Sequence, residues 1–302
     1  MDRATEMAIV VEVLDKGSFT GAADALGLTP SAVSKAVTRL EARLGVRLLE
    51  RTTRRVAVTP EGATYAESAR RILAEIDQAE TAIMEGRGQP SGRLRVNSGT
   101  AFLVHQLAGV LPDFLERYPD IRLDLTVSDK IVDLIAEGMD IAIRTGAVGD
   151  DRLAARRFAE IRRVICASPA YLERHGIPRT PDDLARHSCI NMVSNMQLSL
   201  WPFQVEGQTK VIETRGSVNV DNAESVLALG LAGLGIIRLA NLVVADAVRA
   251  GRLVPLLTDI HVADPVPISL VFPPGRQRLP RVRAFIDFVV EHFKTSPWQI
   301  EA

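Results

Sequence analysis

Apolar residues recur at helical spacing through the first sixty residues of the chain and predict three short helices. The first helix contains the apolar positions Met7, Val10, Val11, Val13 and Leu14. Ser18 is a suitable N-cap for a second helix, and Gly27 follows that helix as a sharp break. Thr29 caps the third helix with Pro30 at its first position, where the missing N–H of proline removes no hydrogen bond.

The third predicted helix has two chemically different faces. Its apolar positions are spaced as i, i+4, i+7 and i+11 and are Val33, Val37, Leu40 and Leu44. The opposite face carries short polar donors and a lysine at Ser31, Ser34, Lys35 and Thr38. Small residues at Ala22 and Ala23 allow the second and third helices to cross closely. The pattern favours a helix-turn-helix whose recognition helix enters the major groove of DNA. The alternative is a plain pair of packed helices with incidental surface serines.

A basic hairpin is predicted directly after these helices. The segment LLERTTRRVAV, residues 48–58, places short apolar strands on either side of a Thr-Thr-Arg-Arg tip. Between Lys35 and Arg55 the chain has seven basic and two acidic residues, a local net charge of +5 in a chain whose overall net charge is -1. A local basic surface is what phosphate binding requires. We therefore expect a wing in which Arg51, Arg54 and Arg55 contact DNA phosphates or the minor groove.

A long helix with a narrow apolar seam is predicted after the hairpin. Thr59-Pro60-Glu61 supplies a cap, a proline and an acidic first turn. The seam then steps alternately by four and three residues through Tyr65, Ala69, Ile72, Ile76, Ala79 and Ile83. This spacing predicts a dimerisation helix, and the alternative is a surface helix that packs on its own domain. Residues 86–92, GRGQPSG, interrupt the helix and mark a hinge.

From residue 93 onward, short apolar strands alternate with helices. RLRVNS, IRLDLTVS and DIAIR are predicted strands, with helices over residues 107–118 and near residues 131–137 between them. A second series contains RRVICAS, CINMV, GSVNV, a helix from Asn222 and the strand GIIR. The strand PVPISLVF and a helix over residues 281–293 close the chain. This βαβα order indicates an α/β domain with a parallel sheet covered by helices.

Polar residues gather where these strands end, and open α/β sheets bind ligands at the carboxyl ends of their strands. The positions are Asn97-Ser98-Gly99-Thr100, Ser128-Asp129, Arg144-Thr145, Asn219 and Asp221-Asn222, with Arg238 nearby in sequence order. The N–H groups that open the helix at Thr100 would suit an anion. Arg144 or Arg238, if it faced the ligand, would hold a carboxylate through two parallel hydrogen bonds. A surface or interlobe salt bridge is the alternative role for each arginine.

Composition adds limits to this outline. With 302 residues, 47% apolar and 24% charged, the chain has ordinary globular composition and is long enough for two domains. Its start, MDRATEM, lacks the basic-then-apolar pattern of a secretory signal. The most apolar run, residues 226–237, is shorter than the roughly twenty residues that a membrane span needs. Cys166 and Cys189 form no disulfide framework. We expect a cytoplasmic protein that neither spans nor binds a membrane.

The sequence gives little support to an enzyme. GSFTG at residues 17–21 has its serine in the wrong position for a nucleophile elbow. GLAGLG at residues 230–235 has reversed spacing for a dinucleotide-binding loop. The five histidines show no HxxxH or HExxH pairing. We therefore expect no catalysis, metal or cofactor. The alternative class is a solute-binding protein without regulatory output, which would need an export signal and no N-terminal DNA module.

One protein family combines these features. The segment AADALGLTPSAVSKAVTRLEARLGVRLLERTTRRVAVTPEG, residues 22–62, resembles the winged helix-turn-helix of LysR-type transcriptional regulators. The resemblance covers the whole chain and includes SDKIVDLIAEGMDIAIRTGAV and RRVICASPAYLERHGIPRTPDDL. This chain has Thr29-Pro30-Ser31 without the family's frequent glutamine, and Leu49 where phenylalanine is common. That glutamine often reads bases in the family, so the operator preference does not follow from the general pattern.

The resemblance implies a domain organisation. It implies a winged helix-turn-helix over residues 1–59, a dimerising linker helix over 60–87 and a hinge over 88–92. A two-lobed α/β regulatory domain like a type 2 periplasmic binding protein follows, with lobe I at residues 91–162 and 267–302 and lobe II at 163–266. The expected partners are double-stranded promoter or operator DNA with dyad symmetry and further copies of the chain, as a homodimer or homotetramer. A small organic effector, expected to be anionic, would bind between the lobes.

Pattern and resemblance together nominate the site residues. The DNA-binding candidates are Ser18, Thr29, Pro30, Ser31, Ser34, Lys35, Thr38, Arg39, Arg51, Arg54 and Arg55. The effector candidates are Ser98, Gly99, Thr100, Ala101, Phe102, Ser128, Arg144, Asn219, Asn222 and Arg238, because the family places ligand contacts in the first of these loops. Through DNA binding, such a protein would associate with the bacterial nucleoid.

Overall fold

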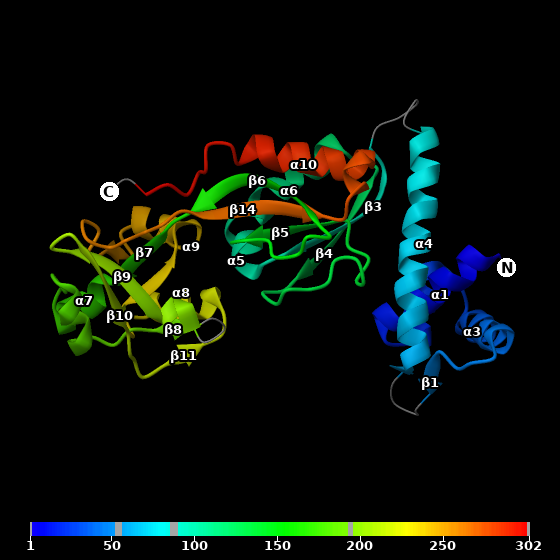
Figure 1. Ribbon diagram of the computed structural model, residues 1–302, viewed down its shortest axis with the longest axis horizontal. Coiled ribbons are helices and arrows are strands. Elements are labelled where there is room, and N and C mark those ends of the chain that lie inside the picture. Colours follow the sequence, from blue (N-terminus) through cyan, green and yellow to red (C-terminus); the bar gives the residue numbers. More distant parts are fainter. Residues whose placement is uncertain (1, 52–55, 85–89, 193–195, 301–302) are drawn as a thin grey trace. The chain divides into compact units, whose positions relative to one another are not determined.

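A computed structural model of the chain describes residues 2–51, 56–84, 90–192 and 196–300 (Figure 1). It contains two compact units. The first comprises residues 1–89, 132–140 and 275–280, and the second comprises residues 90–131, 141–274 and 281–302. Within the described ranges, no helix is long and apolar enough to cross a membrane.

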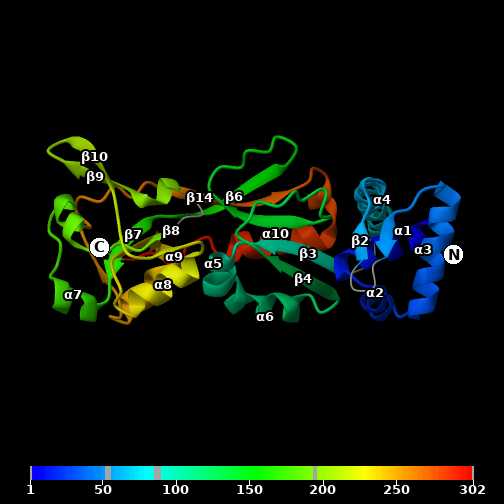
Figure 2. The same cartoon turned by 90° about the horizontal axis from the view of Figure 1, so that it is seen from below.

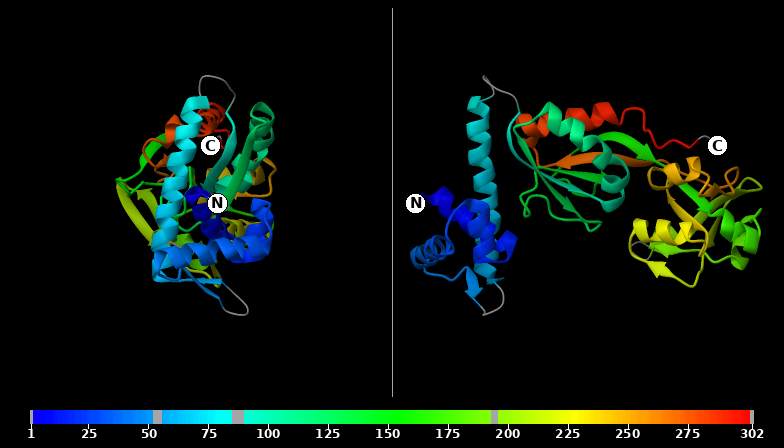
Figure 3. Two further views of the ribbon diagram at one scale, coloured as in Figure 1. Left: turned by 90° about the vertical axis from the view of Figure 1, so that its right-hand side faces the viewer. Right: turned by 180° about the vertical axis from the view of Figure 1, so that it is seen from behind.

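The first unit is a small helical domain with a two-stranded hairpin. Figure 3 shows its short helices beside the N-terminal half of one long helix. The elements are α1 (Arg3–Lys16), α2 (Phe19–Leu26), α3 (Pro30–Leu44), β1 (Leu49–Arg51), β2 (Val56–Val58) and α4 (Pro60–Met84). The predicted caps Ser18 and Thr29 are confirmed, since each accepts a hydrogen bond from the first turn, and Asp2 caps α1 in the same way. Gly17, Gly27 and Gly45 end the three short helices with positive φ angles of 63°, 65° and 72°.

The core of this unit is formed by the apolar faces of α1, α2 and α3. Val33, Val37 and Leu40 on α3 are fully buried, as the predicted stripe requires. Leu44, the fourth predicted member, is instead 38% exposed, because the helix ends there and turns away from the core. The small residues predicted at the helix crossing, Ala22 and Ala23, are fully buried in the same cluster.

The hairpin is fastened to α3 and to α4 by side chains whose role the sequence did not reveal. The Oε1 atom of Glu41 accepts hydrogen bonds from the backbone N–H groups of Leu48 at 2.8 Å and Leu49 at 3.1 Å. Thr59 Oγ1 donates to the carbonyl of Arg47 at 2.8 Å. At Gly62 a Cβ atom would lie 2.0 Å from the Leu48 carbonyl oxygen, so the close approach of α4 to the hairpin requires glycine.

The second unit begins with a five-stranded mixed sheet in the order β4-β3-β5-β14-β6. Its strands are β3 (Gly92–Ser98), β4 (Ile121–Val127), β5 (Ile141–Thr145), β6 (Ala154–Ile161) and β14 (Val266–Phe272). β3 is parallel to β4 and β5, whereas β14 is antiparallel to β5 and β6, so the predicted parallel sheet is only partly correct. The helix predicted near residues 131–137 is wrong: this segment forms turns, and Ile131 is 92% exposed.

Helices α6 (Ala108–Arg117) and α10 (Pro280–His292) pack together beside this sheet. The ring of Phe114 on α6 contacts those of Phe285 and Phe288 on α10, with centroids 5.3 and 5.2 Å apart. Before α6 the chain forms α5 (Thr100–Phe102) and a π-helical turn, η1 (Leu103–Leu107). The expected strands and helices of this lobe are therefore present, apart from the segment after β4.

The second lobe is built on a three-stranded sheet in the order β12-β7-β13. Its strands are β7 (Arg163–Ala167), β12 (Ile237–Ala240) and β13 (Val254–Pro255). Helices α8 (Ala223–Leu231) and α9 (Asn241–Arg249) lie on one side, and the hairpin of β9 (Leu200–Val205) and β10 (Gln208–Glu213) lies on the other (Figure 2). Gly230 of α8 touches Ile237, whereas Trp201 and Phe203 of β9 are buried with Ile165 and Ile236.

A first prediction concerns the fastening of the hairpin. Glu41→Ala removes the acceptor of two backbone N–H groups, so we expect the stability of the N-terminal domain to fall by about 1–3 kcal/mol. Glu41→Gln keeps an oxygen acceptor at the same position and should retain most of this stability. The measurement is urea unfolding of the full chain followed by far-ultraviolet circular dichroism. Equal losses in both variants would show that the carboxylate charge, not its acceptor role, holds the hairpin.

Candidate DNA-binding interface and effector site

The polar face of α3 is open to solvent. Ser31, Lys35, Thr38 and Arg39 are exposed, and Ser34 is half-buried. Their side of the helix is opposite the fully buried Val33, Val37 and Leu40. The recognition face predicted from the sequence is therefore available to a partner along the whole N-terminal half of the helix.

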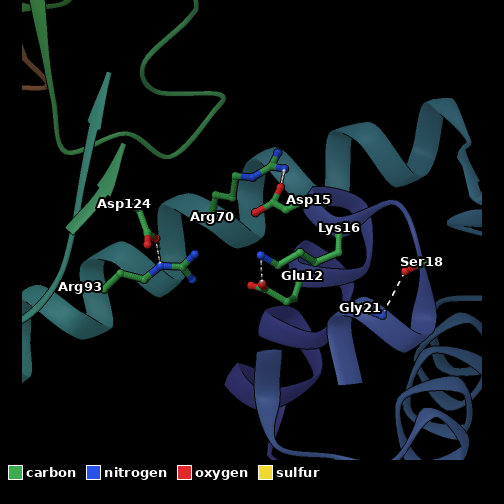
Figure 4. A network of polar contacts seen from close by, with 8 residues as sticks. All are labelled: Glu12, Asp15, Lys16, Ser18, Gly21, Arg70, Arg93 and Asp124. Carbon is green, nitrogen blue, oxygen red and sulfur yellow. Dashed lines mark hydrogen bonds and ion pairs between the residues drawn. The ribbon is translucent and has the colours of Figure 1, made fainter. Parts of the chain in front are cut away.

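Ser18 and Thr29, both predicted to touch DNA, act as helix caps. Ser18 Oγ accepts a hydrogen bond from the Gly21 N–H at 3.0 Å (Figure 4). Thr29 Oγ1 accepts from the Ala32 N–H at 3.2 Å and lies 3.1 Å from Ser31 Oγ. Pro30 is exposed at the first helical position. These residues fix where α2 and α3 begin, and thereby which side chains the two helices present.

The basic residues between Lys35 and Arg55 are not all available to contact DNA. Arg43 Nη2 donates to the buried Glu6 carboxylate at 2.6 Å, an ion pair that ties α3 to α1. The C-terminal half of α3 and the segment that leads to β1 line an open hollow of about 590 Å³. Thr38 and Arg47 are among its lining residues. Arg54 and Arg55 at the hairpin tip, and the side chain of Arg51, lie outside the described residues.

The apolar seam of α4 divides into two parts. Ala69 is 1% exposed and Tyr65 packs against the core of the first unit, so the chain itself covers the beginning of the seam. Ala69 therefore packs on its own domain, the alternative that the sequence left open, while the dimer interface along the seam stays a prediction. Ile72 is half-buried and Ile76 is 38% exposed. The side chains of Ala79 and Ile83 lie outside the described residues.

Arg70, next to Ala69, binds α4 to two other segments of the first unit. Its Nη2 atom donates to Asp15 of α1 at 2.5 Å (Figure 4), and its Nη1 atom donates to the carbonyl of Ala136 at 3.2 Å. Lys16 and Glu12 form a further ion pair along α1, at 3.8 Å. The position of α1 against α4 thus depends on a half-buried arginine as well as on apolar contact.

The carboxyl ends of β3, β4 and β5 lie at one edge of the five-stranded sheet, as the parallel pairing requires. Ser98 is fully buried, and its carbonyl accepts a hydrogen bond from the Ser128 N–H at 3.0 Å. The Thr100 N–H donates to Asp129 Oδ1 at 2.9 Å. A carboxylate of the chain itself therefore holds the Thr100 N–H, and an anion site on the other N–H groups that open this helix stays a prediction.

Arg144 lies at the same edge with part of its guanidinium unpaired. Its Nη1 atom donates to Asn97 Oδ1 of β3. Its Nη2 atom is buried and has no hydrogen-bond partner among the described residues. Burial lowers the pKa of Arg144 below its ordinary value, because the charged form loses hydration. A desolvated cation with a vacant donor is suited to bind an anion.

Two further candidates have structural roles. Phe102 is 4% exposed, and its ring contacts Phe293, Phe158 and Trp298 at centroid distances of 5.3, 5.9 and 6.2 Å, so it belongs to the core. Asn222 caps α8 by accepting from the Ser225 N–H at 2.8 Å. Ala101, beside Phe102, is half-buried. Asn219 is exposed and lies in a short strand that pairs in parallel with the strand of Asn191.

The sequence did not indicate the contact that joins the two lobes. α5 packs against α8 and α9. His105 Nε2 lies 3.0 Å from Glu224 Oε1, and Gln106 Nε2 donates to the Leu242 carbonyl at 2.9 Å. The segment of lobe I from α5 to Gln106 and the helices α8 and α9 of lobe II are therefore neighbours. A histidine in a helix of one lobe and a glutamate over one hundred residues later give no local sequence signal.

Arg238 is separated from these groups by the sheet of lobe II. Ile237 faces α8, so Arg238 faces the opposite side, where its Nε atom donates to His261 Nε2 at 2.9 Å. Burial, with Arg163 as a neighbouring cation, lowers the pKa of Arg238 to about 10. Burial and the same two arginines lower the pKa of His261 to about 4, so this imidazole is neutral at pH 7.

Known proteins resemble this chain over its whole length. Residues 5–63 match the family described as bacterial regulatory helix-turn-helix protein, lysR family, and residues 87–294 match the LysR substrate binding domain. An HTH-type transcriptional repressor of Pseudomonas aeruginosa is 38% identical over 98% of this chain and 94% of its own length. The HTH-type transcriptional regulator CrgA of Neisseria meningitidis serogroup C is 37% identical, with 95% of each chain covered.

Solved structures agree with these sequence relationships. The structure of CrgA, a LysR-type transcriptional regulator from Neisseria meningitidis, is 36% identical with a TM-score of 0.65, covering 97% of this chain and 99% of that one. The full-length structure of the Vibrio cholerae virulence activator AphB is 25% identical with a TM-score of 0.64, covering 96% and 99%.

Proposed function

The chain belongs to the LysR family of bacterial transcriptional regulators, and we propose that it reads operator DNA with the exposed face of α3. It is a DNA-binding regulator with an effector-binding domain rather than an enzyme. The observation that carries the proposal is the two-faced α3, with Val33, Val37 and Leu40 fully buried and Lys35 and Arg39 exposed. We also propose that DNA binding holds the protein at the nucleoid in the bacterial cytoplasm.

Within this interface, residues divide by their chemistry. Ser31, Ser34 and Thr38 are short donors and acceptors suited to base edges, whereas Lys35 and Arg39 suit phosphates or guanine. Ser18 and Thr29 would contribute indirectly, by fixing the helix starts. Arg51, Arg54 and Arg55 are proposed as phosphate contacts of the wing on sequence grounds.

The second prediction tests this interface. In a gel-shift titration with the promoter beside its own coding region, Lys35→Ala with Arg39→Ala should weaken binding by roughly tenfold or more, since each base contact is worth about 1–3 kcal/mol. Log affinity falls as log salt concentration rises, and each lost phosphate contact should reduce the steepness of this fall by about 0.9. The matched control, Arg179→Ala with Arg252→Ala, removes two exposed arginines from lobe II. Unchanged affinity in the α3 variant, or equal losses in both, would reject the interface.

Dimerisation is assigned to the later part of α4. A helix-turn-helix gains specificity when two copies meet half-sites about one DNA turn apart. Ile72, Ile76, Ala79 and Ile83 continue the heptad spacing beyond the part that the chain itself covers. We therefore place the domain junction at the predicted boundaries, with residues 60–87 as the linker helix and residues 88–92 as the hinge. A homotetramer would need a second interface in the regulatory domain.

The third prediction follows from this division of the seam. Ile76→Glu places a charge in the proposed interface and should convert dimers or tetramers to smaller species in sedimentation velocity. Glu75→Gln, at the exposed position directly before Ile76, should leave the assembly unchanged. Ala69→Glu should instead destabilise the fold, because Ala69 is buried within the chain. Assemblies of normal size with Ile76→Glu would place the interface elsewhere.

The effector site is assigned to the edge formed by β3, β4 and β5, beside the start of α8. Arg144 supplies the buried, unpaired Nη2 donor, and Thr100 supplies a hydroxyl next to the contact between α5 and α8. Ser98, Gly99, Ser128 and Asn219 would shape this edge, and Asn222 would fix the start of α8. An anionic effector would pair with Arg144, and Asp129 would disfavour binding of a second negative charge. By altering the contact of His105 with Glu224, the effector would shift the lobes, with a coupling to DNA binding of typically 1–3 kcal/mol.

The fourth prediction tests the effector site. Thermal-shift screening of the full chain with small carboxylates should find a compound that stabilises it. Arg144→Gln should remove that stabilisation and Thr100→Val should weaken it, because they remove a cationic and a hydroxyl donor. Arg179→Gln, in lobe II, is the control. A compound that stabilises the wild type and Arg144→Gln equally would exclude Arg144 from the site.

A further inference from the structure

Two arginines and a histidine form a cluster of cationic and donor groups in lobe II, at the joint between the lobes. β7 and β12 are antiparallel, with Ala240 opposite Arg163 and Arg238 opposite Ile165. Arg163 and Arg238 therefore lie on the same face of the sheet as diagonal neighbours, a spacing of about 7–8 Å between backbones that long side chains bridge. His261 reaches the same place from the segment that follows β13.

The residues around this cluster are tied to both connections between the lobes. Only Arg162 separates β6 of the first lobe from Arg163, and its N–H donates to Asn241 Oδ1 at 3.1 Å while its Nη1 donates to the Ala263 carbonyl at 2.8 Å. His261 is bridged to Phe203 of β9 through its backbone, and its ring lies 5.9 Å from the Phe203 ring. The cluster thus sits beside both segments that connect the lobes.

Positive charge in this cluster exceeds the negative charge near it. Among the described residues, no carboxylate lies within ion-pair distance of Arg163 or Arg238. Asp264 is exposed and acts on Arg238 from farther away, so two guanidinium charges face one distant carboxylate. Burial lowers the pKa of Arg163 and of Arg238, which shows that both charges have lost hydration. An unpaired, half-buried cation is unfavourable unless an anion completes the site.

The donor geometry indicates the kind of anion. Because Arg238 Nε donates to His261 Nε2, the neutral imidazole carries its proton on Nδ1 and is itself a donor there. The remaining nitrogens of Arg238 and the whole guanidinium of Arg163 are also donors. We propose that Arg163, Arg238 and His261 form a binding site for a small oxyanion, either inorganic phosphate or the carboxylate of a small metabolite. This site is separate from the effector site at Arg144, because Arg238 faces away from α8.

The test is thermal unfolding of the full chain in buffers of equal ionic strength that contain chloride, inorganic phosphate or succinate. Phosphate or succinate should raise the melting temperature of the wild type in a saturable manner, by about 2–4 °C at concentrations a few-fold above Kd. Arg163→Gln should remove this rise, and Arg163→Lys should retain part of it. Because Arg163 has an unpaired charge, Arg163→Gln should melt no lower than the wild type in chloride. The comparison of phosphate with succinate distinguishes the two sources of the oxyanion.

Two matched variants separate this site from other effects. Arg252→Gln removes an exposed arginine of the same lobe and should keep the full rise. If the rise is lost in Arg144→Gln and not in Arg163→Gln, the anion binds at the effector site and the proposal is overturned. The proposal is likewise overturned if the wild type shows no rise beyond chloride, or if Arg163→Gln shows the wild-type rise. A lower melting temperature of Arg163→Gln in every buffer would show that Arg163 acts in packing only.

Discussion

Burial of one face of α3 is the constraint on which the rest of this regulator depends. Val33, Val37 and Leu40 are fully covered by α1 and α2, and this contact leaves the side chains of Lys35 and Arg39 no direction except toward solvent. The hairpin and the start of α4 are attached to these packed helices. The ion pair between Arg43 and Glu6 joins α3 to α1. The face that we propose to contact DNA is therefore set by apolar packing on the other side of the same helix.

The regulatory domain has, at two separate places, arginines that lack a carboxylate partner among the residues that the structure describes. At the sheet edge, Asp129 already holds the Thr100 N–H, which leaves Arg144 as the principal cation there. On the far face of lobe II, Arg163 and Arg238 lie beside the segments that connect the lobes. A ligand that neutralises either group would change the charge balance at a place where the lobes meet. If both proposed sites bind ligands, the two positions would offer separate inputs to one conformational equilibrium.

Local signals in the sequence predicted most of the first unit. Caps at Ser18 and Thr29, glycine stops and helical spacing are short-range features, and each is present in the structure. The heptad seam of α4 predicted a partner contact at every position, yet Ala69 is buried in its own domain, because spacing alone does not show which surface an apolar residue faces. Long-range contacts left no signal: Glu41 with the hairpin, His105 with Glu224 and Arg238 with His261 are brought together only by the fold. Arg238 was grouped with the effector residues because it is close to Asn219 and Asn222 in sequence order, yet in β12 it faces the side of the sheet opposite to α8.

We propose that the exposed face of α3, which is oriented by the packing behind it, contacts DNA. Acylation of lysines in the full chain, measured by mass spectrometry with and without promoter DNA, reports on this face. Lys35 should react readily in the free protein and be protected by promoter DNA, while the exposed Lys210 of lobe II should react equally in both samples. Equal reactivity of Lys35 with and without bound DNA would show that another surface of the protein meets DNA.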